Sequence, residues 1–412
     1  MYRNILNRQS IKNVYKKIEK YIVNTPLEYN KRLSDKYKAN VYLKREDLQE
    51  TRSFKIRGSL NKIINLNDTR DIICASAGNH AQGVSYSCNL LNLYGKIYVP
   101  NTTPLQKINR IKSLGGNNID LQIRGDTLKE SMDFALDYSE KNNCIFVHPY
   151  NDLDVIKGQA TIGLEILDKI KPDIVITCVG GGGLTAGLGG FIKNYVPKCK
   201  IIGVEPRGAS SMYKALEAGF PYELTNLDTF VDGASVSKIG DIPYSILKDF
   251  MDIKDIQLVS NGHLCNNILE LYENEGIIVE PAGCLSVTGL DKLEREEIEG
   301  KTIVCIVSGG NNDVMRYSEI IEKNLLYLDR KHYYIIKFKQ KPQELKNFIL
   351  NVLGIDDDIT RFEYIKKNNI HLGDVLVGIE TDNNIMLEKN LIKKKFIYKK
   401  IHEDDLIYNY IV

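Results

Sequence analysis

Residues 173–187 read Asp-Ile-Val-Ile-Thr-Cys-Val-Gly-Gly-Gly-Gly-Leu-Thr-Ala-Gly. The apolar, β-branched run before the glycines predicts a buried strand, and the residues after them predict a helix. Four consecutive glycines, Gly180 to Gly183, let the backbone curl so that several N–H groups point at one place, and the helix dipole adds positive charge there. The stretch therefore predicts a phosphate-binding turn. A flexible turn without a ligand is the alternative.

This turn differs from the two common nucleotide-binding turns. No Gly-Lys-Ser/Thr follows the glycines, as a P-loop requires. The glycines are consecutive and lack the spacing that marks a dinucleotide site. A phosphate on some other small molecule is the remaining interpretation.

The same alternation of strand and helix continues on both sides of the glycine run. Apolar runs predict further strands at 41–44, 71–75, 96–100, 118–123, 145–147, 200–206 and 301–307, and helical spacing predicts helices between them, including 53–66, 104–114 and 156–170. Such alternation is typical of parallel sheets with helices on both faces. The sequence therefore predicts an α/β fold.

Two other strand ends carry polar groups. The strand at 71–75 is followed by Ser76-Ala77-Gly78-Asn79-His80 and a helix, so backbone N–H groups at a helix N-terminus could bind an anion. An ordinary turn without a ligand is equally compatible with this stretch. Ser308 follows the strand at 301–307, and ligands of parallel sheets bind at the carboxyl ends of strands.

Lys55 is the candidate nucleophile. It lies in Ser53-Phe54-Lys55-Ile56-Arg57-Gly58, at the start of the helix predicted over 53–66, for which Ser53 is the predicted N-cap. A lysine amine attacks an aldehyde only when unprotonated. Burial, a helix N-terminus, or nearby cations such as Lys44 and Arg57 would lower its pKa. Taken alone, the hexapeptide is more typical of a solvated lysine.

Composition excludes several classes of protein. The chain has 412 residues, 43% of them hydrophobic and 26% charged, with a net charge of +2, which predicts two or three soluble domains and no polyanion or nucleic-acid partner. No apolar run reaches the roughly 18 residues that span a membrane, and the N-terminus lacks a secretory core. Eight scattered cysteines without a CxxC pair suit buried thiols in a reducing cytoplasm, and the histidines lack metal-ligand spacing.

The last 80 or so residues show a different pattern. Strands are predicted at 332–339, 359–366, 373–380 and 396–401, with helices at 342–353 and 384–395. This βαββαβ order predicts a ferredoxin-like module, with domain boundaries of 1–329 and 330–412. The module carries no catalytic constellation, so we expect it to serve ligand binding or contacts in a homo-oligomer, a dimer or a tetramer.

Together, Ser53-Phe54-Lys55, Ser76 to His80, the tetraglycine and Ser308-Gly309-Gly310-Asn311 closely resemble the threonine deaminase (threonine ammonia-lyase) branch of the fold-type II pyridoxal 5'-phosphate (PLP) enzymes. The resemblance covers nearly the whole chain. It implies two open α/β subdomains with mostly parallel sheets, the smaller and mobile one at about 41–148. The tail resembles the ACT-like regulatory domain of the biosynthetic short form, through 362–364 and 375–380.

The resemblance implies a role for each motif. Lys55 would hold PLP as a Schiff base and move the Cα proton, and Phe54 would pack beside the ring. Asn79 would bind the phenolic oxygen, and Ser308 would face the pyridine nitrogen. The remaining implied sites are the phosphate site (Gly180, Gly181, Gly182, Gly183, Leu184) and the substrate carboxylate site (Ser76, Ala77, Gly78, Asn79, His80).

The implied reaction is the conversion of L-threonine to 2-oxobutanoate and ammonia, the first step of isoleucine biosynthesis. L-serine would be a secondary substrate, and isoleucine would be the effector of the 330–412 module. A hydroxyl such as that of Ser308 does not force the pyridine nitrogen to be protonated, so the cofactor is a weaker electron sink, which suits β-elimination.

The resemblance leaves one site and several activities open. Serine racemase and similar relatives bind a divalent cation after the strand that corresponds to 201–204. Glu205 and Ala209 fit that site, but Ser211 stands where an aspartate is expected, so we predict no obligatory metal. Serine racemase, L-serine deaminase, threonine synthase or cysteine synthase activity is the alternative within the fold. A catalytically idle, ligand-sensing protein is the alternative of another class.

Overall fold

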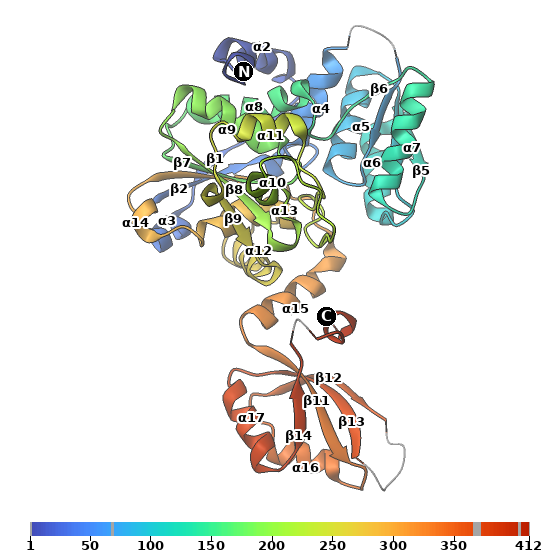
Figure 1. The fold of residues 1–412 in the computed structure, drawn as a ribbon, viewed down its shortest axis with the longest axis vertical. Coiled ribbons are helices and arrows are strands. Elements are labelled where there is room, and N and C mark those ends of the chain that lie inside the picture. The colour runs from blue at the N-terminus through green and yellow to red at the C-terminus, as the bar shows by residue number, and fades with distance from the viewer. Residues whose placement is uncertain (1, 67–69, 366–371, 403–404, 412) are drawn as a thin grey trace. The chain divides into compact units, whose positions relative to one another are not determined.

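The computed structural model describes residues 2–66, 70–365, 372–402 and 405–411. They form two compact units, one within 1–313 and one within 314–412 (Figure 1). The boundary predicted at 329–330 lies inside the second unit, between α15 (Tyr317–Tyr327) and β11 (Lys331–Lys339).

A six-stranded sheet forms the centre of the first unit. Its order is β1-β2-β10-β7-β8-β9, and every neighbouring pair is parallel except β1 with β2. The bounds are β1 (Leu27–Tyr29), β2 (Asn40–Arg45), β7 (Ile174–Cys178), β8 (Lys200–Pro206), β9 (Ile256–Val259) and β10 (Thr302–Val307). The β7 strand predicted before the tetraglycine is thus central, with β10 and β8 beside it.

Helices pack closely against this sheet. α9 (Gly183–Tyr195) follows the tetraglycine and packs on β7 and on α8 (Leu153–Leu167). α13 (Pro281–Leu290) packs on β7, β8, β9 and β10, and all ten of its residues are buried. No helix was predicted at α13. A helix that is apolar on every side shows no amphipathic period, so its pattern gave no helical signal.

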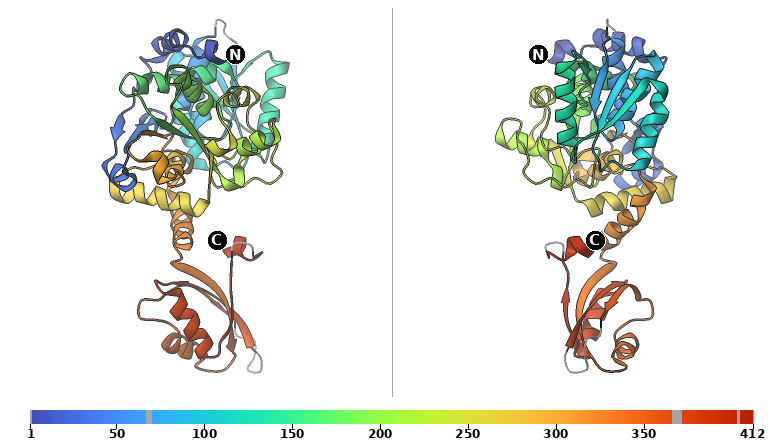
Figure 2. Two further views of the ribbon diagram at one scale, coloured as in Figure 1. Left: turned by 60° about the vertical axis from the view of Figure 1, so that its left-hand side comes forward. Right: turned by 90° about the vertical axis from the view of Figure 1, so that its right-hand side faces the viewer.

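The smaller sheet has four parallel strands in the order β5-β4-β3-β6. Its strands are β3 (Ile72–Ala75), β4 (Gly95–Val99), β5 (Ile119–Ile123) and β6 (Ile145–Phe146). Ile72 and Cys74 pack with α5 (Asn79–Leu91) and α6 (Leu105–Gly115), whereas Ile73 and Ala75 pack with α7 (Leu128–Lys141). Helices therefore cover both faces (Figure 2), as the α/β prediction requires. The mobility of the smaller subdomain, expected at about 41–148, stays a prediction.

The predicted N-cap at Ser53 is wrong. α4 (Lys55–Ile64) begins at Lys55 with Phe54 as its N-cap, and no side chain caps it. Ser53 instead forms an isolated antiparallel bridge with Gly309, and its Oγ has no hydrogen-bond partner among the described residues. Pairing with a distant segment has overridden the local capping preference.

The second unit contains the predicted βαββαβ order. Its antiparallel sheet runs β12-β13-β11-β14. Side chains from alternate positions of β11 and β13 form one core with α16 and α17, so both helices cover the same face of the sheet. The bounds are β12 (Asp358–Tyr364), β13 (Leu372–Glu380), β14 (Ile397–Lys400), α16 (Glu344–Asn351) and α17 (Asn384–Lys393). Residue 366, the expected end of the second strand, lies outside the described residues.

The remaining elements are short or peripheral. They are α1 (Tyr2–Ile5), α2 (Arg8–Ile18), α3 (Lys31–Tyr37), η1 (Glu46–Leu48), η2 (Gly116–Asn118), η3 (Arg207–Ala209), α10 (Ser211–Ala218), α11 (Asp241–Leu247), η4 (Ile253–Asp255), α12 (Asn261–Glu275), α14 (Arg295–Ile298), η5 (Val314–Arg316) and α18 (Tyr408–Ile411). Among the described residues, no helix combines the length and the apolar character needed to cross a bilayer.

Candidate active site

Lys55 lies beside the carboxyl end of β10. The segment before Lys55 pairs with the residues that follow this strand: Phe54 N–H donates to the Ser308 carbonyl at 3.1 Å, and Gly310 N–H donates to the Arg52 carbonyl at 2.9 Å. These two bonds flank the bridge between residues 53 and 309. The candidate nucleophile and the predicted pyridine partner are therefore brought together across more than 250 residues of sequence.

The Lys55 amine occupies a weakly polar setting. Its Nζ donates to the Pro149 carbonyl at 3.0 Å and lies 5.3 Å from the centre of the Phe54 ring. Burial lowers the pKa of Lys55 to about 8, although part of the residue reaches solvent. We expected the nearby cations Lys44 and Arg57 to lower the pKa of Lys55. That expectation is wrong, because both are paired with carboxylates. Burial is the cause of the lowered pKa.

The glycine turn lies against Tyr150, the residue after Pro149. A Cβ on Gly181 would stand 2.1 Å from Cγ of the Tyr150 ring, and a Cβ on Gly180 would stand 3.0 Å from the Ala234 Cα. Gly182 has a φ of 85°, which L-residues with side chains rarely adopt. Side chains are thus excluded from this turn.

The backbone donors of the turn are free. No N–H group from residue 180 to 185 donates to a backbone carbonyl of the described part of the chain, and the first such bond of α9 runs from Ala186 to Gly182. α9 also has no side-chain cap. Unpaired N–H groups at a helix start favour an anion.

The second predicted turn precedes α5 and is also uncapped. Gly78 N–H donates to Ser76 Oγ at 3.2 Å, and a Cβ on Gly78 would meet nothing within 4 Å. The His80 ring is buried, and its Nε2 lies 2.8 Å from the Val147 carbonyl. Burial lowers the pKa of His80 to about 3, so the ring is neutral. Space around Gly78, together with the backbone of the turn, can therefore receive a ligand.

The Ser308 hydroxyl is buried between two partners. Its Oγ donates to the Ala282 carbonyl at 3.2 Å and accepts from Cys178 Sγ at 3.3 Å. Cys178 is the last residue of β7, two positions before the first glycine of the turn. The carboxyl ends of β7 and β10 thus meet at this hydroxyl.

Sequence reasoning missed Glu280. Its Oε1 accepts a hydrogen bond from Asn79 Nδ2 at 2.6 Å, and Asn79 Oδ1 accepts one from Asn311 Nδ2 at 2.7 Å. Burial raises the pKa of Glu280 to about 7. A glutamate before Pro281, at the start of an apolar helix, was the one available signal, since Pro is favoured at the first helical position.

The profile of the family described as "Pyridoxal-phosphate dependent enzyme" matches residues 18–309. The chain belongs to this family. The matched range contains Lys55, both turns and Ser308. A second profile, described as the C-terminal regulatory domain of threonine dehydratase, matches residues 322–411. The fold class expected from the resemblance is thereby confirmed.

The sequence similarity to curated relatives covers both units of this pyridoxal-phosphate dependent enzyme. A protein of Halalkalibacterium halodurans named "L-threonine dehydratase biosynthetic IlvA" is 44% identical over 99% of this chain and 98% of its own. The Bacillus subtilis protein of the same name is 42% identical over the same shares. The family branch named from the motifs is therefore confirmed.

Solved structures show the same fold. The processed threonine deaminase isoform 2 of Solanum lycopersicum has a TM-score of 0.72 and 37% identity, covering 78% of this chain and 90% of that one. The serine racemase of Dictyostelium discoideum has a TM-score of 0.68 and 30% identity, covering 74% and 98%.

The residues present fit PLP. The unpaired N–H groups of residues 181–185 suit a phosphate, and the buried amine of Lys55 suits an aldehyde. The Oγ atoms of Ser53 and Ser235 are buried and have no hydrogen-bond partner among the described residues. A buried hydroxyl without a partner is costly, so a polar ligand beside it is favoured.

Glu205, the residue considered for a cation, lies on β8 and accepts hydrogen bonds from the start of α10. Met212 N–H donates to Oε1 at 2.7 Å, and Tyr213 N–H donates to Oε2 at 2.9 Å. Ser211 Oγ lies 3.5 Å from Oε1. Within the described ranges no cluster of three His, Cys, Asp or Glu side chains could hold a metal. The absence of an obligatory metal stays a prediction.

Proposed function

We propose that this chain converts L-threonine to 2-oxobutanoate and ammonia as a PLP-dependent threonine ammonia-lyase, the first step of isoleucine biosynthesis. One observation carries the proposal: relatives that are 42–44% identical over 99% of the chain are named biosynthetic L-threonine dehydratase. The match of the C-terminal unit to the regulatory domain of threonine dehydratase favours this activity over serine racemase.

Bound PLP withdraws electrons from the substrate Cα, so that its proton is lost more easily. The protein residues supply the rest. The Lys55 amine, with its pKa near 8, holds the cofactor and afterwards accepts the Cα proton. In the turn from Ser76 to His80, Ser76 N–H already donates to the Tyr98 carbonyl and Gly78 N–H to Ser76 Oγ. The other backbone N–H groups of the turn orient the substrate carboxylate, and positioning contributes much of the rate. The His80 ring stays neutral because burial lowers its pKa to about 3, and its Nε2–H donates to the Val147 carbonyl.

Two groups would orient the cofactor ring. Asn79 is held between Glu280 and Asn311, which leaves its second amide N–H for the phenolic oxygen. Ser308 would face the pyridine nitrogen, and Gly180 to Leu184 would bind the phosphate. A hydroxyl at the ring nitrogen favours elimination of the β-hydroxyl.

Incubation of the purified protein with L-threonine, L-serine and phosphohomoserine tests the activity. Keto-acid formation is followed for each substrate, together with the absorbance of the bound cofactor. We expect the highest kcat/KM with L-threonine and a lower value with L-serine. Racemised serine without keto acid, or turnover of phosphohomoserine alone, would contradict the proposal.

Isoleucine binding to the C-terminal unit is the proposed regulation. The unit has its own core and matches the regulatory-domain family at 322–411. A titration of isoleucine against the full chain, and against a chain ending at Asp313, tests this. We expect inhibition of the full chain alone. Equal insensitivity of both would rule it out.

A cytoplasmic homo-oligomer, a dimer or a tetramer, completes the proposal. None of the eight cysteines forms a disulfide, and seven are buried, which suits a reducing compartment. The edge strands of the C-terminal sheet, β12 and β14, offer unpaired backbone groups for contact with a second copy. Sedimentation of the purified protein measures the oligomeric state.

A further inference from the structure

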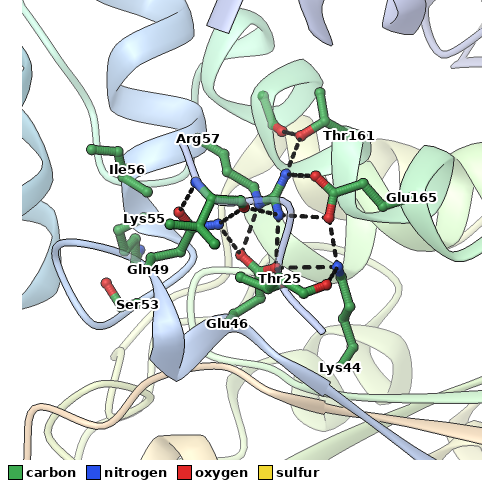
Figure 3. A network of polar contacts seen from close by, with 12 residues as sticks. Thr25, Lys44, Glu46, Gln49, Ser53, Lys55, Ile56, Arg57, Thr161 and Glu165 are labelled. Carbon is green, nitrogen blue, oxygen red and sulfur yellow. Dashed lines mark hydrogen bonds and ion pairs between the residues drawn. The ribbon is translucent and has the colours of Figure 1, made fainter. Parts of the chain in front are cut away.

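Four buried charged side chains form a network around Arg57, which follows Lys55 by two residues on α4. Arg57, two residues along α4, stands between Glu46 of η1 and Glu165 of α8, and Lys44 of β2 pairs with Glu165 at 2.5 Å (Figure 3). Arg57 and Glu46 expose none of their surface. Two cations and two anions balance, so the cluster carries no net charge.

The Arg57 guanidinium uses all five of its N–H donors. Nε and Nη2 bind the two oxygens of Glu46, both at 2.8 Å. Nη1 and Nη2 bind the two oxygens of Glu165 at 2.7 and 2.9 Å, and Nη1 also reaches Thr161 Oγ1 at 3.2 Å. A planar fork held on two sides fixes its orientation, which a lysine ammonium cannot reproduce.

The helices α4 and α8 touch beside this fork. A Cβ on Gly158 would stand 2.3 Å from the Arg57 carbonyl and 2.6 Å from the Gly58 Cα. A Cβ on Gly58 would stand 2.3 Å from Gln159 Nε2. The two backbones approach as closely as glycine allows, so a small slip between these helices would break both the steric fit and the fork.

The register of α4 against α8 also decides where the Lys55 amine lies. Lys55 is the first residue of α4, and its Nζ binds the Pro149 carbonyl in the segment that leads into α8. Buried ion pairs are a weak source of stability, because desolvation offsets most of the attraction. A geometric role accounts for four charges at this place better than stability does.

We propose that Arg57 is a positioning residue for Lys55: its two-sided pairing with Glu46 and Glu165 fixes α4 against α8 and so aims the Lys55 amine at the cofactor aldehyde. This inference rests on the proposed role of Lys55. The Lys55 nitrogen forms a C=N bond to the aldehyde carbon of PLP, and the aldehyde oxygen leaves as water. None of the four charged side chains is assigned a contact with substrate or cofactor.

Comparing the binding of two ligands distinguishes misplacement of the Lys55 amine from a general loss of folding. Full-length protein, stripped of cofactor, is titrated with PLP and with pyridoxine 5'-phosphate, which has the same phosphate and ring but an alcohol in place of the aldehyde. The ratio of the two Kd values measures the contribution of the Lys55 bond. In Arg57→Lys, which keeps the charge, we expect the preference for PLP to fall about tenfold while the Kd of pyridoxine 5'-phosphate stays within about twofold.

A second variant keeps the test decisive if Arg57→Lys does not fold, as judged by circular dichroism. Lys44→Met with Glu165→Gln removes one cation and one anion together, which leaves no unbalanced buried charge and frees one side of the fork. The same fall in the ratio is expected. Arg45→Lys is the matched control, because Arg45 in the same segment pairs with Asp47 and Glu28, outside the network.

The outcomes distinguish this inference from the proposed function. An unchanged ratio in the folded variants, or Kd values that rise in equal proportion for both ligands, would overturn the role of Arg57. A wild-type chain that binds both ligands equally would overturn the role of Lys55 itself.

Discussion

Asn79 Nδ2 donates a hydrogen bond to Glu280 Oε1 at 2.6 Å, and 201 residues of sequence separate the two. Asn79 starts α5 beside the smaller sheet, whereas Glu280 precedes α13 beneath the larger one. The contact thus joins the parts of the catalytic unit on either side of the proposed cofactor. It holds the amide that we expect to meet the phenolic oxygen.

Truncation of Glu280 should damage this arrangement, and an amide replacement should spare it. Glu280→Ala leaves a partly buried donor of Asn79 without its acceptor, at a cost of about 1–3 kcal/mol, or roughly fivefold to 150-fold in kcat/KM. Glu280→Gln can still accept the bond through its Oε1, so we expect a loss of only a few-fold. Equal losses in both variants would contradict a role through Asn79.

The stability of the wild type and that of Glu280→Gln should depend differently on pH. Burial raises the pKa of Glu280 from 4.5 to about 7, so the folded state disfavours its ionisation. The stability that follows from this shift is present below pH 4.5 and is lost as the pH rises to about 7. We expect the urea midpoint of the wild type, relative to Glu280→Gln, to fall across this window and then level off. A difference that is constant with pH would contradict the shift.

Lys55→Ala should abolish both turnover and the absorbance of bound cofactor. The variant loses the amine that donates to the Pro149 carbonyl, while the glycine turn is untouched. Pyridoxine 5'-phosphate, which needs no amine, should still bind and serves as the control for folding. Retained activity would refute the assigned role.

The lowered pKa of Lys55 has a measurable consequence in the cofactor-free chain. At pH 7 an amine with a pKa of about 8 is roughly one-tenth neutral, against roughly three parts in ten thousand for a pKa of 10.5. The rate of recombination with PLP should therefore rise about tenfold per pH unit below 8 and level off above it. A rise that continues to pH 10 would show that burial has no such effect.

Much of this candidate site could be predicted from short motifs, because binding a phosphate or an aldehyde requires particular residue types at neighbouring positions. The tetraglycine, Lys55 and Ser308 each stand at the end or start of a regular element, which single-sequence patterns detect. Glu280 and the Ser53–Gly309 pairing could not be predicted, because both depend on contacts between segments far apart in sequence. The buried helix α13 lacked any period that a pattern could detect.

Alanine at two glycines should separate cofactor binding from substrate binding. In Gly181→Ala the new Cβ would stand 2.1 Å from the Tyr150 ring, so the turn must shift and affinity for PLP should fall at least about tenfold. In Gly78→Ala the Cβ meets nothing within 4 Å, so folding and PLP affinity should be unchanged. Because Gly78 lies in the turn proposed for the carboxylate, KM for threonine should rise. Identical effects of the two variants would contradict these separate roles.

Activity should survive exhaustive chelation. Both oxygens of Glu205 accept backbone N–H bonds from α10, and burial raises the pKa of its carboxyl to about 8, so at pH 7 it is a poor cation ligand. Ser211 supplies a hydroxyl where the resemblance to serine racemase implies an aspartate. Turnover is measured before and after treatment with EDTA, with PLP in excess. Loss that magnesium alone restores would contradict the prediction. Ser211→Asp is the informative companion, since a magnesium-dependent rise in Tm confined to that variant would show that the missing carboxylate is what the site lacks.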